Sequence, residues 1–323
     1  MNDNRQKVLV VGPALTLSGY GEQTRFALRA LRSQEDQYDI YLNTTSWGAT
    51  GWLHEDNEER EWIDSLLHKT VQFGQQNGQF DMSLQVTIPN EWQKIAPVDV
   101  GYTAGIETTR VSGEWIQASR NIDRIIVVSN HSKEIYENTQ YDMIDQQTHQ
   151  KVGVAKCEVP VISVNYPVKS FDPVDLGLNF STDFNFLTVA QMGPRKNVPA
   201  TIEAFVEEFH DNEDVGLILK TSTKNNSSMD RHHTSEKIKQ YLEEKFPKRK
   251  CKVYILHGYM LESEMAALYR NESIKGFCTA THGEGFGLPM FDAAIAGMPI
   301  IASEWSAYKE FLTMPQAKKK GKK

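Results

Sequence analysis

The sequence predicts an α/β protein built from two doubly wound, Rossmann-like domains, and three observations support this. The 323 residues suffice for two domains of about 150 residues each. Short β-branched runs alternate with segments of helical period, as in mostly parallel sheets. An irregular stretch containing Pro160, Pro167 and Pro173 interrupts the alternation. We therefore predict three parts: an N-terminal domain of residues 1–168, a C-terminal domain of residues 169–312, and a lysine-rich tail of residues 313–323.

The N-terminal half is expected to begin with a buried parallel strand over residues 7–11, which stops at Gly12 and Pro13. A glycine loop, residues 18–21, precedes a helix over residues 22–32. Residues 47–79 are polar and partly helical, and they are interpreted as an insertion into the alternation. The remaining elements expected here are strands over residues 39–42, 84–88, 98–102 and 124–128 and helices over residues 113–119 and 132–138.

The C-terminal half alternates more clearly and is predicted to be doubly wound. Its expected strands cover residues 184–190, 215–220, 253–256, 276–279 and 299–303. Its expected helices cover residues 198–210, 235–245, 262–271 and 289–296.

Charge and cysteine usage restrict the class of protein. The net charge is −7 although five lysines crowd the end of the chain, so the remainder is more acidic still and nucleic acid is not an expected partner. The lysine tail is interpreted as a solvated segment. Three distant cysteines fit neither a disulfide framework nor a paired-cysteine zinc site. A polar start and the absence of a long apolar run predict a cytoplasmic protein, with peripheral membrane contact left open.

The most informative segment for function is HGEGFGLPMFDAAIAG, residues 282–297, which lies between an expected strand and an expected helix. Glycines there let the backbone approach a ligand, and the following helix offers unpaired N–H groups and its positive dipole end. The sequence therefore predicts a phosphate site at residues Gly285, Phe286, Gly287 and Leu288.

Two carboxylates, Glu284 and Asp292, flank this glycine loop, and Asp292 is expected in the first turn of the helix. Carboxylates beside a phosphate are favourable when they accept hydrogen bonds from ligand hydroxyls, such as those of a sugar or ribose. The alternative is a solvated loop residue and an ordinary carboxylate near a helix start.

A basic pair, Arg195 and Lys196, follows the strand expected at residues 184–190 and precedes the next helix. At such a junction Arg195 can bind a diphosphate bidentately, and Lys196 can act as a point charge. Alone, an exposed pair in a turn would be the simpler interpretation.

Together these segments resemble glycosyltransferase family 4, whose members have the two-domain GT-B fold. The match is strong over residues 184–312 and weak over residues 7–30 and 98–168. In this family two acids separated by seven residues flank the sequence Gly-Phe-Gly-Leu-Pro. The resemblance implies that Glu284 contacts the donor sugar, that Asp292, where glutamate is usual, contacts the nucleotide ribose, and that Lys196 and Arg195 hold the donor diphosphate. Family members continue beyond the position of Glu310, so the resemblance also implies a shortened C-terminal part.

The N-terminal half contributes weaker candidates. Gly19 and Gly21 follow the first expected strand, where they face the cleft in a fold of this type and are candidates for contact with donor phosphate or acceptor; an ordinary turn is the alternative. Glu107 follows the strand expected at residues 98–102. The resemblance places it on the acceptor side, and the alternative is a surface carboxylate.

The predicted function is transfer of a sugar from a nucleotide diphosphate sugar to a glycan, lipid or small-molecule acceptor, with retention of configuration implied by the resemblance. The cationic side chains and loop amides suffice for the leaving diphosphate, so neither a cofactor nor a metal is expected. Two alternatives stay open: a non-catalytic nucleotide-sugar or glycan-binding protein, and a nucleotide-sugar epimerase of the same architecture.

Overall fold

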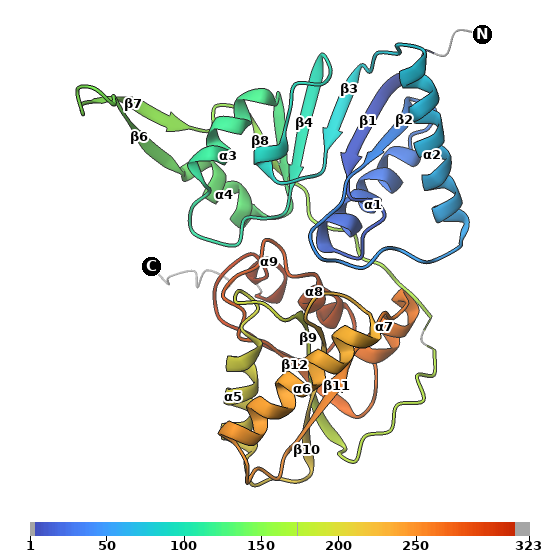
Figure 1. Cartoon of the computed structure of the whole chain (residues 1–323), viewed down its shortest axis with the longest axis vertical. Helices are drawn as coiled ribbons and strands as arrows, with labels where there is room; N and C mark the ends of the chain where they lie inside the picture. The colour runs from blue at the N-terminus through green and yellow to red at the C-terminus, as the bar shows by residue number, and fades with distance from the viewer. Residues whose placement is uncertain (1–3, 173, 314–323) are drawn as a thin grey trace, which may run out of the picture. The chain divides into compact units, whose positions relative to one another are not determined.

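The computed structural model describes residues 4–172 and 174–313, and it contains two compact α/β units (Figure 1). The first unit comprises Met1–Lys169 and Lys224–Ser227, and the second comprises Ser170–Thr223 and Ser228–Lys323. Lys169 lies with the first unit, whereas the predicted boundary assigned it to the second domain. The predicted tail falls, apart from Thr313, outside the described residues.

The first unit is built on a six-stranded parallel sheet of order β2-β1-β3-β4-β5-β8. Val8 and Val10 of β1 are fully buried, as expected for a parallel strand covered on both faces. The strands are β1 Gln6–Gly12, β2 Tyr38–Thr44, β3 Met82–Gln85, β4 Val98–Thr103, β5 Arg124–Val127 and β8 Val161–Ser163.

The helices of the first unit begin at polar residues that cap their first N–H groups. Ser18, Asn57, Ser112 and Ser129 each accept a hydrogen bond from an amide of the following turn. The helices are α1 Gly19–Arg32, α2 Glu58–Gln75, α3 Gly113–Ala118 and α4 Asn130–Asn138, with short 3₁₀ turns η1 Pro89–Glu91 and η2 Ser119–Asn121. An antiparallel hairpin, β6 Gln140–Ile144 and β7 Lys151–Lys156, extends from this unit (Figure 1).

Two predictions for this unit were wrong. Residues 47–79 are not an insertion, because α2 is the regular crossover helix between β2 and β3 and packs on β2. Only Ile63 and Leu66 of its 18 residues are buried, which left its helical period faint. The expected glycine loop at residues 18–21 is the capped start of α1, since Ser18 accepts the Gly21 amide at 2.9 Å.

The second unit has a five-stranded parallel sheet of order β11-β10-β9-β12-β13, in agreement with the doubly wound prediction. Its strands are β9 Phe184–Gln191, β10 Val215–Ser222, β11 Lys252–Leu256, β12 Ile274–Cys278 and β13 Ile300–Ile301. Its helices are α5 Val198–Phe209, α6 Ser228–Lys245, α7 Glu262–Tyr269, α8 Leu288–Ile295 and α9 Lys309–Leu312.

Alternate residues of β10 divide the core of this unit between the two faces of the sheet. Leu217 and Leu219 join the cluster that contains the apolar residues of α5 and α6. Ile218 joins the opposite cluster, with Leu268 of α7 and Met290 of α8. Helices therefore cover both faces, and the ligand-accessible backbone is left at the ends of the strands.

All three cysteines are free thiols. Within residues 4–172 and 174–313, no helix combines the length and apolar character needed to cross a membrane.

Candidate functional site

The candidate site lies where the strand order of the second unit reverses. From β9 the chain passes to β10, which pairs with one side of β9, and later to β12, which pairs with its other side. In open parallel sheets, ligands bind at the carboxyl ends of the two strands that flank such a reversal. The segments leaving those ends are residues 192–197 after β9 and residues 279–287 after β12, which carry the predicted basic pair and glycine loop.

The carboxylate of Glu284 brings these two segments together. Lys196 donates from Nζ to Oε1 of Glu284 at 2.6 Å, and the guanidinium of Arg195 contacts Oε2 at 2.8 Å. The two cations therefore occupy different oxygens of one carboxylate. Thr281, a residue that the sequence did not single out, donates its hydroxyl to Oε1 at 3.0 Å. Glu284 is only 7 % exposed because these partners enclose it.

Charge controls the ionisation of this carboxylate. Burial raises the pKa of Glu284, but the nearby charges of Lys196 and Arg195 and their hydrogen bonds outweigh burial, so the pKa is lowered below its ordinary value. Glu284 is thus an anion that neutralises one of two positive charges. The side chains of Arg195 and Lys196 remain 36 % and 22 % exposed, so the cationic surface faces solvent.

Backbone contacts hold the two loops in register. His282 donates its amide to the carbonyl of Arg195 at 2.9 Å, and the side-chain amide of Asn197 donates to the carbonyl of Ala280 at 3.1 Å. Asn197 has φ of 47°, a left-handed conformation that asparagine adopts more readily than most residues. This conformation turns the chain from the basic pair into α5.

Ser306 supports Glu284 from a third segment, after β13. Its hydroxyl accepts the amide of Glu284 at 2.8 Å and donates to the carbonyl of the same residue at 2.7 Å. The resemblance over residues 184–312 includes Ser306 without giving it a role. The role of this serine depends on a contact across 22 positions, which no local pattern reveals.

The start of α8 has the geometry of an anion-binding helix terminus. Gly287 is the N-cap residue, with φ of +96°, and a Cβ there would lie 2.9 Å from a Met290 methyl. Leu288 is the first helical residue, so its N–H group needs no partner within the helix. Phe286 is 4 % exposed and packs with Phe291 and Phe311, which anchors the loop rather than exposing its ring.

Asp292 does not lie in the first turn of α8, contrary to the prediction. The helix begins at Leu288, so Asp292 is its fifth residue and lies in the second turn. Asp292 contributes to the raised pKa of the buried Tyr269 on α7, after the larger effect of burial. Asp292 is half-buried.

The first unit brings Gly19, Gly21 and Glu107 to one neighbourhood through Tyr20. A Cβ on Gly21 would lie 2.1 Å from the carbonyl oxygen of Thr16, so close packing requires glycine there, whereas Gly19 borders open space. The hydroxyl of Tyr20 lies 2.7 Å from that of Thr103 at the end of β4. Burial, together with the lesser effect of Glu107, raises the pKa of Tyr20 to about 12, so the phenol stays neutral.

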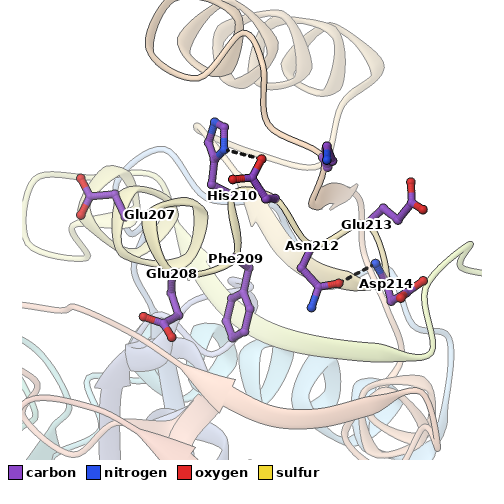
Figure 2. Close-up of a pocket in the computed structure, with 9 residues that line it drawn as sticks. Glu207, Glu208, Phe209, His210, Asn212, Glu213 and Asp214 are labelled. Carbon is purple, nitrogen blue, oxygen red and sulfur yellow. Dashed lines mark hydrogen bonds and ion pairs between the residues drawn. The ribbon is translucent and has the colours of Figure 1, made fainter.

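A surface hollow of about 660 Å³ lies near the amino ends of the strands of the second sheet, opposite the candidate site (Figure 2). It surrounds the turn from α5 into the amino end of β10, where His210 contacts Asp211 at 3.3 Å and Asn212 accepts the Asp214 amide at 3.0 Å. Five carboxylates and one lysine line it, namely Glu207, Glu208, Asp211, Glu213, Asp214 and Lys250. Its charge and its position therefore disfavour a nucleotide diphosphate.

Among the residues that the structure describes, no group of three or more histidine, cysteine, aspartate or glutamate side chains is arranged to hold a metal ion.

Comparison with known proteins shows which fold carries these loops. No family model matches the chain. A stretch of 126 residues, 39 % of the chain, is 29 % identical to the serotype-specific mannosyltransferase WbdA of Escherichia coli. The match spans 14 % of that protein's length.

Solved structures match over nearly the whole chain. HepE of Anabaena in complex with UDP-glucose has a TM-score of 0.58 at 15 % identity, covering 96 % of this chain and 84 % of its own. The lipopolysaccharide outer core galactosyltransferase WaaB, in its apo form, has a TM-score of 0.55 at 12 % identity with the same coverage. OtsA, also apo, has a TM-score of 0.58 at 10 % identity, covering 94 % of this chain and 86 % of its own. These matches show the GT-B fold, as the sequence resemblance implied.

Proposed function

We propose that this chain, which has the fold of GT-B glycosyltransferases, transfers a sugar from a nucleotide diphosphate sugar to an acceptor. One observation carries the proposal: Lys196 and Arg195 converge on Glu284 beside the start of α8, at the switch point of the second sheet. Two cations and a helix N-terminus together suit a diphosphate. HepE, which has the same fold, is in complex with UDP-glucose, which supports a donor of this class.

The proposed chemistry transfers the glycosyl group between two oxygens. The bond from the anomeric carbon to the diphosphate oxygen breaks, a bond to the acceptor hydroxyl oxygen forms, and the hydroxyl proton passes to the departing diphosphate. Negative charge grows on that diphosphate, and Lys196, Arg195 and the first amides of α8 are oriented to stabilise it. This division of labour uses no metal. Retention of configuration belongs to the proposal through the family resemblance.

Glu284 has two roles in this proposal. Before the donor binds, it keeps both cations in position, which reduces the reorganisation needed on binding. With the donor bound, its carboxylate accepts hydrogen bonds from sugar hydroxyls, and Asp292 does the same for the ribose.

The test measures donor binding and turnover separately. Thermal unfolding with UDP, GDP, ADP and their sugars identifies the nucleotide, because a ligand that binds only the folded state raises its stability. Release of nucleotide diphosphate is then followed with and without a pool of candidate acceptors. We expect release that depends on an acceptor and falls strongly in Glu284→Gln. Binding without release would instead indicate a nucleotide-sugar-binding protein, and sugar interconversion without acceptor would indicate an epimerase.

A further inference from the structure

The carboxyl edge of the first sheet carries aromatic side chains that the donor site does not use. This sheet also has a switch point, because from β1 the chain passes first to β2 on one side and then to β3 on the other. The first turn of α1 and the loops after β2 and β4 leave the same edge. A ligand crevice is expected at such an edge on general grounds.

Tyr20 and Trp47 form an aromatic pair at this edge. Their ring centroids lie 4.2 Å apart with planes inclined by 34°. Tyr20 is 7 % exposed, and its hydroxyl is tied to Thr103 and to the amide of Ala104. Trp47 comes from the loop after β2 and keeps part of its surface accessible. A buried phenol, held by its hydrogen bonds, therefore packs against a partly accessible indole.

A second tryptophan of the same loop is held by a short backbone ladder. Trp52 pairs with Thr16 in an antiparallel bridge. The flanking hydrogen bonds, from Leu17 to the carbonyl of Gly51 and from Leu53 to that of Leu15, are both 2.8 Å long. Although its backbone is fixed, the Trp52 side chain is 49 % exposed. This indole is therefore accessible to a ligand while its backbone is held in place.

We propose that Trp47 and Trp52, supported by Tyr20, form a saccharide-binding subsite in the first unit. The negative face of an aromatic ring attracts the partly positive C–H groups that cover one face of a pyranose. Glu107, on the loop after β4, and the polar residues of the loop after β2 supply hydrogen-bond acceptors at the same edge. Aromatic surface mixed with carboxylate and hydroxyl groups fits a glycan better than a lipid tail, which would require a continuous apolar groove.

This inference names the acceptor class and so rests on the proposed glycosyltransferase function. The subsite itself can be tested without turnover. Saturation-transfer NMR on the full chain, with excess UDP, would use methyl α-mannoside, mannobiose, lactose and N-acetylglucosamine as saccharide probes and farnesyl phosphate as the lipid probe.

The wild-type chain is expected to bind at least one saccharide. Trp47→Leu and Trp52→Leu should each weaken that binding about tenfold, while Trp47→Phe, which keeps an aromatic face, should retain most of it. Trp62→Leu is the matched control, because this indole of α2 contacts Arg32 at the outer surface. Thermal unfolding of each variant shows that it is folded.

Absence of saccharide binding by the wild type, binding of farnesyl phosphate alone, or equal loss in Trp62→Leu would overturn the inference. Nucleotide-sugar binding, measured on the same samples, separates the subsite from the proposed function.

If donor binding persists in Trp47→Leu and saccharide binding is lost, the subsite is supported. If the wild type binds donor and hydrolyses it but binds no saccharide, the subsite fails and the donor assignment stands. If the wild type binds no nucleotide sugar, the proposed function fails, whether or not saccharide binding is observed.

Discussion

Each unit contains a largely buried glutamate side chain that is held by arginine and lysine. In the first unit Glu22 of α1 contacts Arg25 at 2.7 Å, Lys169 at 2.6 Å and Arg29 at 3.5 Å. In the second unit Glu284 contacts Arg195 at 2.8 Å and Lys196 at 2.6 Å. Each cluster joins one carboxylate to at least two cations at similar distances, so the ion pairs alone do not indicate which of them binds a ligand.

The arginines distinguish the clusters. Arg25 is 7 % exposed and donates further to the carbonyls of Ala14 and Thr16, so it fastens the loop after β1 to α1. Arg195 is 36 % exposed, at a switch point and near a helix start. Arg29 of the first cluster is as exposed as Arg195, so exposure alone does not mark an anion site; the location at a switch point beside a helix start does. Each prediction below tests this distinction.

The largest effect is expected for Arg25→Met. The change leaves Glu22 with Lys169 and the more distant Arg29 and leaves two carbonyls without their donor, so the unfolding free energy should fall by about 3–5 kcal/mol. Urea denaturation measures it. Lys133→Ala, which removes an exposed helix pair with Glu137, is the control and should cost less than about 0.5 kcal/mol. Equal losses in the two variants would contradict a structural role for Arg25.

The Glu22 cluster should also make the unfolding free energy depend on pH in the acid range. Burial raises the pKa of Glu22, but Arg25 and Lys169 outweigh it and lower the pKa from 4.5 to about 2. The folded state therefore binds fewer protons than the unfolded state between these values. The stabilisation is complete above about pH 4.5 and is lost as the pH falls towards 2, on the order of 3 kcal/mol in total. Denaturation midpoints at several pH values should fall less steeply for Glu22→Gln than for wild type.

Lys196→Ala tests the exposed cluster. It removes one charge directed at the donor, so nucleotide diphosphate affinity should drop by about 1.5–3 kcal/mol, measured by calorimetry. Lys245→Ala is a matched control, since that lysine pairs with Glu203 on α5 and is 51 % exposed. Unchanged affinity in Lys196→Ala would refute the diphosphate assignment.

The smallest effect is expected at the two ends of α8. Gly287 and Gly297 have φ of +96° and +76°, so alanine should cost about 1–2 kcal/mol of stability at either position. Only Gly287→Ala should also weaken nucleotide binding, because it alone lies at the proposed phosphate terminus. A loss of affinity in Gly297→Ala of the same size would show that α8 stability, not loop geometry, determines binding.

Elements that have a local sequence pattern could be predicted from the sequence. β-branched runs predicted every strand of the doubly wound sheet of the second unit, because buried parallel strands are continuously apolar. Glycines and Pro289 marked the start of α8 to within one residue. The basic pair and the acidic loop could be identified as candidates from residue type and from their positions after expected strands.

How those candidates meet follows from contacts between segments that lie far apart in the chain. The pairing of Glu284 with Lys196 joins positions 88 residues apart, and the contacts of Thr281 and Ser306 follow from the same meeting of loops. The role of the polar helix α2 as a regular crossover, the start of α1 at Gly19 and the second-turn position of Asp292 were missed or misplaced. Exposed helix faces carry little hydrophobic period, and a helix start depends on capping contacts made in space. The Tyr20–Trp47 pair escaped notice for a related reason: its two rings come from different segments, and only the folded sheet edge brings them together.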